Sequence, residues 1–180
     1  MIGFIQQMIN GLSIGSVYAL MAVGYSLVYS IMNFSNFAHG GVIMIGSYIG
    51  FFCISLLNFS FPVAFVTAAL GSGILAIIVE RVAYNPLRKR NAPFLYFIIS
   101  AMGASIFLEN IVVATIGPTF RTYPPVFSAT PIQIGALTIG RLDVLMFVIS
   151  AISLSILVYI IEKTKIGLAI RATSYSSKGS

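Results

Sequence analysis

Polar side chains that could do chemistry in this chain gather in one short stretch between two long apolar runs. The stretch holds the amides Asn33 and Asn36, the single histidine His39, and two adjacent glycines, Gly40 and Gly41. Backbone that leaves a helix within lipid needs hydrogen-bond partners from protein or water, and amide and imidazole groups can supply them. The stretch therefore predicts a packed hinge between two membrane helices, beside a translocation path. An ordinary polar loop at the membrane surface would explain the same residue types.

A second candidate is the acidic residue Glu109, which lies inside an apolar run and is followed by Asn110. An ionisable group at that depth is costly and usually faces the interior of a bundle or water. The pair predicts a polar lining of the path or a contact that couples movement to an ion. A structural hydrogen bond to a neighbouring helix, or a protonated acid, is the alternative.

The residues typical of enzymes are absent from the sequence. One histidine and one cysteine give no metal-ligand spacing, and neither paired carboxylates nor a G-x-x-x-x-G-K-[ST] phosphate loop occurs. We therefore expect no enzyme activity, no metal and no cofactor. If ATP drives this protein, another chain has to hydrolyse it.

The composition indicates an integral membrane protein. Of the 180 residues, 58% are hydrophobic and only 8% are charged, whereas a soluble domain carries about a quarter charged residues. No charged residue precedes Glu80. The net charge of +6 lies next to the apolar runs, so it indicates orientation in a membrane and gives no reason to expect nucleic acid.

A membrane-spanning helix needs about 20 mainly apolar residues, and five runs meet this requirement. Alternating apolar residues around Gly135 and Ala136 predict a small β-hairpin on the outer face. The predicted fold is an all-α membrane protein, a polytopic bundle with an extracellular hairpin, in one domain, 1–180. The predicted spans are about 4–31, 40–57, 61–83, 94–116 and 142–161.

Small residues recur along several of these runs. Such residues let helix backbones approach closely in lipid, so we expect them to mark packing faces. The first run carries Gly11, Gly15 and Ala19 at intervals of four, and further glycines in the later runs are Gly46, Gly50, Gly71, Gly73 and Gly103.

The basic residues predict the orientation of the chain. With five spans, eight of the ten Lys and Arg residues fall on one side of the membrane. The positive-inside rule makes that side cytoplasmic. The N-terminus is then outside, and residue 180 is cytoplasmic.

Five sequence blocks together carry a family resemblance. They are Asn10–Leu20, Gly24–Tyr25, Asn36–Gly40, Glu80–Arg88 and Thr164–Thr173. These blocks resemble the N-terminal part of branched-chain amino acid ABC transporter permeases. The resemblance covers nearly the whole chain, although Asn85 stands where many relatives carry Arg.

The resemblance implies the membrane-spanning half of a prokaryotic inner-membrane importer for leucine, isoleucine or valine. A second, similar permease, cytoplasmic ATP-binding subunits and an extracellular or periplasmic substrate-binding protein would complete it. Permeases for urea and short amides are similar, so they are an alternative. The basic tail, residues 163–180, resembles the approach to the coupling helix that docks on the ATPase. Attraction to lipid alone would also explain its basic residues. Its candidate coupling residues are Thr164, Lys165, Gly167 and Arg171.

The same resemblance leads us to expect that the family's chain continues past Ser180, so that this sequence is an N-terminal fragment. Two other classes of protein compete with the permease. An ion-coupled carrier or channel would use Glu109. Such a mechanism requires paired ionisable residues inside the membrane, and Glu109 is the only clear candidate in these apolar runs. An accessory membrane protein without a path gives no reason for the polar stretch or for the basic tail.

Overall fold

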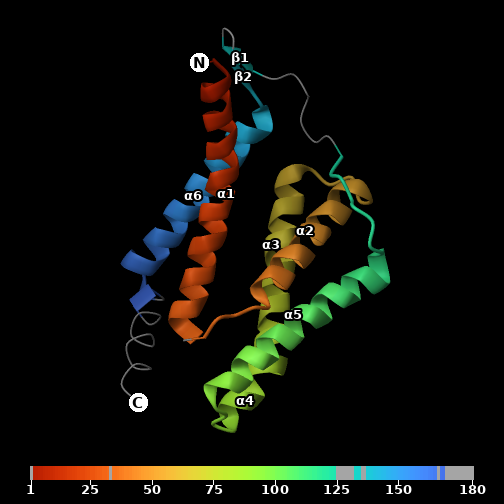
Figure 1. The fold of residues 1–180 in the computed structure, drawn as a ribbon, viewed down its shortest axis with the longest axis vertical. Helices are drawn as coiled ribbons and strands as arrows, with labels where there is room; N and C mark the ends of the chain where they lie inside the picture. Colours follow the sequence, from red (N-terminus) through yellow and green to blue (C-terminus); the bar gives the residue numbers. More distant parts are fainter. Residues whose placement is uncertain (1, 33, 125–131, 135–136, 166, 169–180) are drawn as a thin grey trace. The chain divides into compact units, whose positions relative to one another are not determined.

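The computed structural model describes residues 2–32, 34–124, 132–134, 137–165 and 167–168 (Figure 1). Among these residues, five helices are long and apolar enough to cross a bilayer, which confirms the predicted all-helical, polytopic class. The third predicted run differs most, because α3 gives way to a π-helical turn, η1, and then to the short helix α4. The helices are α1 Ile2–Met32, α2 His39–Ser55, α3 Phe61–Val79, η1 Glu80–Tyr84, α4 Asn85–Lys89, α5 Phe94–Ile116 and α6 Arg141–Lys163.

The chain divides into two compact units. Unit 1 comprises Met1–Asn33 and Phe127–Ser180, and unit 2 comprises Phe34–Val126. Each unit is described by itself below. The single domain over 1–180 stays a prediction.

Unit 1 is built on α1 and α6, which pack along each other. Each helix buries a small polar residue, Ser13 in α1 and Ser150 in α6, and small side chains allow helices to approach closely in lipid. The strands β1 Ile132–Ile134 and β2 Leu137–Ile139 pair in antiparallel fashion, with Ile132 opposite Ile139. This pairing agrees with the alternation in the sequence, and the side of the membrane on which the strands lie stays a prediction.

The predicted small-residue stripe of α1 makes no packing contact within the described residues. A Cβ at Gly11 or Gly15 would meet nothing within 4 Å, and Ala19 is exposed. The reason is the helical rotation of about 100° per residue. Ser13 is two residues from each glycine, so the face that α1 buries is nearly opposite the stripe.

Unit 2 uses glycine as predicted where α2 packs on α3. A Cβ at Gly46 would lie 3.1 Å from the Cβ of Ser72, and one at Gly71 would lie 2.7 Å from Cδ1 of Ile49. The two helices therefore approach at a distance that larger residues would not permit. Gly73, by contrast, faces open space, so its position in α3 does not require glycine.

The connection that follows α5 is attached to α2 by Tyr123. Its hydroxyl donates a 2.5 Å hydrogen bond to the carbonyl of Ser47, and its ring meets Phe51 edge-on at 5.6 Å. Partial burial raises the pKa of the Tyr123 hydroxyl, and the neighbouring Cys53 adds to the rise. The group therefore stays protonated, and able to donate, at neutral pH.

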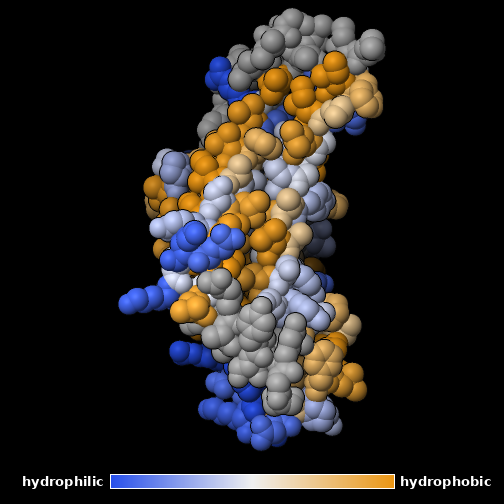
Figure 2. Space-filling view, turned by 90° about the vertical axis from the view of Figure 1, so that its left-hand side faces the viewer, coloured by the Kyte–Doolittle hydropathy of each residue, from blue (hydrophilic) through white to orange (hydrophobic). Residues whose placement is uncertain are grey.

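The outer surface of the helices is apolar, as a bilayer requires. Large hydrophobic side chains stay exposed along the helices, for example Phe4 (72%), Leu70 (63%) and Phe107 (63%). Figure 2 shows hydrophobic side chains over much of this face, with hydrophilic ones in separate groups at mid-height and at the lower end of the view. The sequence therefore buries few large residues inside each unit and leaves the rest exposed on the surface of the helices.

Candidate functional site

The polar stretch that leads into α2 folds against the π-helical turn η1. The hydroxyl of Tyr84, the last residue of η1, donates to Oδ1 of Asn36 at 2.6 Å. The N–H of Ala38 donates to the same oxygen at 3.2 Å, which closes the local turn typical of asparagine. Ala38 and Tyr84 are 0% and 1% exposed. Asn36 is thus the centre of a packed junction, and its role as a hinge stays a prediction.

Aromatic rings pack around Tyr84, which donates this hydrogen bond. Phe34 is buried and meets the ring of Tyr84 edge-on at 5.1 Å. Phe34 also contacts Phe97 of α5 at 5.3 Å. The hydrogen bond itself is partly buried, which makes it electrostatically stronger than an exposed one. The junction therefore links the loop before α2, the end of η1 and α5.

The turn η1 replaces the last turn of a longer α-helix, and Pro86 supplies the reason. In an α-helix Pro86 would leave the carbonyl of Val82 without a donor and would clash with it. The wider turn changes the pairing, so that the N–H of Asn85 donates to the carbonyl of Glu80. π-helical turns occur frequently at functional sites. Sequence reasoning missed this turn, although a proline one residue after Asn85 was a visible signal.

Two further contacts hold η1 in place. The hydroxyl of Ser100 in α5 donates to the carbonyl of Ala83 at 2.8 Å. Arg88 in α4 forms a 3.0 Å ion pair with Glu80 at the start of η1. The turn is therefore attached to α5 through its backbone carbonyl at Ala83 and to α4 through the side chain of Glu80, as well as to the Asn36 loop through Tyr84.

The other residues predicted for the hinge lie around this junction. His39 is the first residue of α2 and is half-buried. Gly40 is exposed and meets nothing within 4 Å, whereas a Cβ at Gly41 would lie 3.1 Å from Cδ1 of Leu108. The close approach to α5 therefore uses the second glycine of the pair. Asn33 lies outside the described residues.

Glu109 and Asn110 are not brought to the junction. Both are exposed on α5, and both bond to their own helix. The hydroxyl of Ser105 donates to Oε1 of Glu109 at 3.0 Å, and Nδ2 of Asn110 donates to the carbonyl of Ile106 at 2.7 Å. Their part in a polar path stays a prediction, since the structure supplies a local partner for each.

The candidate coupling residues begin where α6 ends. The hydroxyl of Thr164 donates to the carbonyl of Ile160 at 2.5 Å and accepts from the N–H of Gly167 at 3.1 Å. Thr164 thus ends one helix and caps the next turn, as N-cap residues do. Gly167 is buried, and a Cβ there would overlap the carbonyl oxygens of Ile160 and Ile161. Lys165 is exposed, and Arg171 lies outside the described residues.

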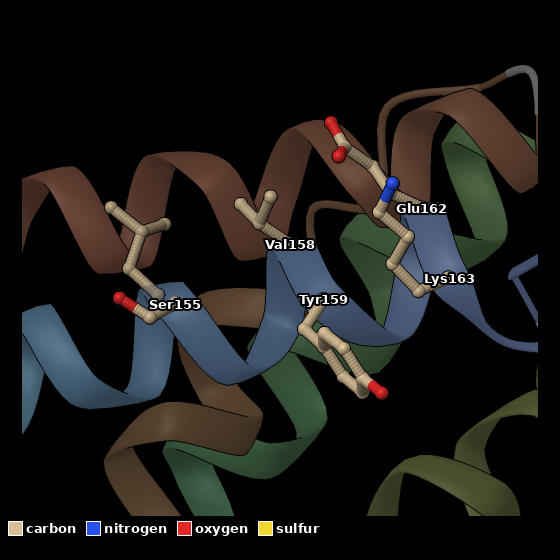
Figure 3. Close-up of a pocket in the computed structure, with 6 residues that line it drawn as sticks. Ser155, Val158, Tyr159, Glu162 and Lys163 are labelled. Carbon is tan, nitrogen blue, oxygen red and sulfur yellow. The ribbon is translucent and has the colours of Figure 1, made fainter.

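Two hollows lie on the described surface. One, of about 410 Å³, is lined by Leu154, Ser155, Val158, Tyr159, Glu162 and Lys163. All six belong to α6, and Figure 3 shows their side chains leaving that helix in different directions. The other, of about 250 Å³, lies between α2 and α3 beside Tyr123. The first is therefore a groove on one helix, while the second is part of helix packing. The described residues contain no group of His, Cys, Asp and Glu side chains that could hold a metal ion.

Five long apolar helices and a packed polar junction define a multi-pass membrane protein. The family model described as "Branched-chain amino acid transport system / permease component" matches residues 7–180. The chain belongs to this family, and the predicted resemblance is confirmed.

Curated relatives are similar along nearly the whole chain. The high-affinity branched-chain amino acid transport system permease protein BraD of Pseudomonas aeruginosa is 36% identical, with 97% of this chain and 60% of the relative covered. The permease protein LivH of Escherichia coli K12 is 35% identical with the same coverage. A probable LivH of Methanocaldococcus jannaschii is 28% identical, with 88% and 51% covered. The chain thus spans 60% of the length of the first two relatives. No solved structure matches it.

Proposed function

We propose that this chain is a transmembrane permease subunit of an ATP-driven importer for branched-chain amino acids. The observation that carries the proposal is the family match over residues 7–180. Relatives named as high-affinity branched-chain amino acid permeases add the substrate class. A permease for urea or short amides is the alternative within the same family.

The proposed importer contains further chains. A second permease completes the translocation path, cytoplasmic ATP-binding subunits supply the energy, and a periplasmic or extracellular binding protein delivers the substrate. The sequence supports this division of work because it has no phosphate-binding loop. The permease subunit itself is then no enzyme, and it works in a prokaryotic inner membrane.

Within that importer, the junction around Asn36 serves as a hinge. Its contacts support this role, because the Tyr84 hydroxyl joins η1 to the loop before α2 and the Ser100 hydroxyl joins η1 to α5. A displacement of η1 would thus be passed on to both. We assign the hinge to Asn33, Asn36, His39 and Gly40, and a polar lining of the path to Glu109 and Asn110.

The orientation follows from charge. We place the N-terminus and the β-hairpin Ile132–Ile139 outside, with the loop before α5 and residue 180 in the cytoplasm. The opposite orientation would move most basic residues across the membrane, against the positive-inside rule. Thr164, Lys165, Gly167 and Arg171 then lie on the side where the ATP-binding subunits dock.

Labelling of cysteine variants tests this orientation. We expect Asn91→Cys to stay unreactive toward a membrane-impermeant thiol reagent applied to intact cells. Asn91 is exposed, so only the membrane would shield it. Thr122→Cys, on the exposed connection after α5, should react and serves as the positive control. Labelling of Asn91→Cys from outside would contradict the orientation.

Uptake by the assembled importer tests the function. The full complex, reconstituted in vesicles, should accumulate labelled leucine only when ATP and the ATP-binding subunits are present. Labelled urea in parallel vesicles identifies the alternative substrate class. Uptake driven by an ion gradient without ATP-binding subunits would overturn the proposal in favour of a carrier that uses Glu109.

The variant Glu109→Gln separates the two mechanisms further. We expect leucine uptake within about twofold of wild type, because the amide oxygen of glutamine can still accept from Ser105 and an expensive charge is removed. The measurement is initial uptake rate at equal expression. A complete loss of uptake would support ion coupling through Glu109.

A further inference from the structure

The end of the third membrane span carries a cluster of exposed cations. Arg81, Arg88, Lys89 and Arg90 are all exposed, and Glu80 is the one acid among them. Glu80 pairs with Arg88 at 3.0 Å. Arg81, Lys89 and Arg90 form no ion pair with any described residue. Three positive charges therefore remain available on one short segment, which we name the basic turn and define as residues 81–90.

The backbone of the basic turn is fixed at both ends. Asn91 adopts a left-handed φ of 47°, and the N–H groups of Asn91 and Ala92 donate to the carbonyls of Arg88 and Leu87. This is the Schellman arrangement that ends helices. At the other end Tyr84 is buried against Asn36. The cations thus stand on an ordered support, which lowers the entropy lost when they bind a partner.

Apolar side chains within and next to the basic turn are exposed. Within it Val82 is 71% exposed, and next to it on α5 Phe94, Leu95 and Tyr96 are between 55% and 61% exposed. Aromatic residues next to Lys and Arg at the end of a span mark the level of the lipid headgroups. A partner for this surface must combine negative charge with adjoining hydrocarbon, and an anionic phospholipid does so.

We propose that the basic turn binds the headgroup of an anionic phospholipid through Arg81, Lys89 and Arg90. The attraction of a basic segment to an anionic membrane surface amounts to about fivefold in affinity for each basic residue. Its three cations are different residues from those assigned to the hinge and to coupling, and the proposal does not depend on which substrate the protein carries. Arg88 is not included, because it forms an ion pair with Glu80.

The test uses the purified full chain in detergent, titrated with phosphatidylglycerol or phosphatidylcholine and observed by native mass spectrometry. We expect the wild type to prefer phosphatidylglycerol by at least about tenfold. The triple variant Arg81→Gln, Lys89→Gln and Arg90→Gln should lose that preference and keep its affinity for phosphatidylcholine, with an unchanged circular dichroism spectrum.

A matched control removes the same charge elsewhere. The variant Arg121→Gln, Arg141→Gln and Lys163→Gln, all at exposed positions, should keep the preference within about twofold. An equal loss in both variants, or none in the first, would overturn the proposal. The first variant could instead keep its preference for phosphatidylglycerol but no longer co-purify with the ATP-binding subunits. In that case the basic turn binds a protein, and the proposal fails.

Discussion

Replacing Tyr84 by alanine is expected to lower the free energy of unfolding of unit 2 by about 3–5 kcal/mol, the range for removing a large buried aromatic ring. Tyr84 is 1% exposed, its ring contacts Phe34, and its hydroxyl donates to Asn36. The change would leave a cavity at the point where three segments meet. Unfolding in sodium dodecyl sulfate, followed by circular dichroism, measures the effect.

Two variants separate the ring from the hydroxyl. Tyr84→Phe keeps the ring and removes one hydrogen bond, which in membrane proteins contributes about 0.6 kcal/mol on average and at most about 1.7. Tyr96→Ala serves as the matched control, because Tyr96 is 55% exposed and its loss leaves no cavity. Equal destabilisation by Tyr84→Ala and Tyr96→Ala would show that the junction is not a packed element.

A side chain at Gly167 is expected to uncouple ATP hydrolysis from transport. Even the methyl group of Gly167→Ala would overlap the carbonyl oxygens of Ile160 and Ile161, and Gly167→Trp would displace the turn altogether. In the complete importer we expect substrate-stimulated ATP hydrolysis to fall at least about tenfold, which is a loss of about 1.4 kcal/mol in coupling. Stimulated hydrolysis and co-purification of the ATP-binding subunits are the two measurements.

Gly73→Ala is the matched control for that experiment, because a Cβ at Gly73 meets nothing within 4 Å. A second variant, Lys165→Gln with Arg171→Gln, keeps the shape of the turn and removes charge. Attraction to lipid depends on summed charge, whereas docking into a protein groove depends on shape. Wild-type behaviour of Gly167→Trp alongside a strong loss in the charge variant would refute docking.

Hydropathy was enough to predict the long helices. Each of the five spans requires about 20 apolar residues whatever its neighbours are, so α5 was predicted over the same residues, 94–116, that the structure assigns to it. Packing faces were less predictable, since glycine spacing is equally regular on a face that packs and on one that does not. Gly46 packs against Ser72, while Gly15 contacts nothing within 4 Å.

A packed polar stretch around Asn36 was predicted, and its partner was not. The role of this stretch as a hinge stays a prediction. The residue types around Asn36 indicated a need for hydrogen bonds, but nothing local identifies a donor 48 residues away. Tyr84 lay just outside the predicted span 61–83, in the loop that follows it. Its role depends on the π-helical turn, which changes the direction in which its side chain leaves the backbone. A sequence analysis that assumes a helical period of 3.6 residues cannot predict such a change in side-chain direction.

The π-helical turn also changes the rotational relation between the helix before it, α3, and the helix after it, α4. One extra residue within a helix rotates everything that follows by about 100° around the axis. The side chains of α3 and those of α4 therefore belong to two separate helical wheels, although the chain runs through η1 without a break. Deleting one residue between Glu80 and Tyr84 would join α3 and α4 into one continuous helix. The cations of α4 would then point in a different direction around the helix axis, although the composition of the span would be almost unchanged.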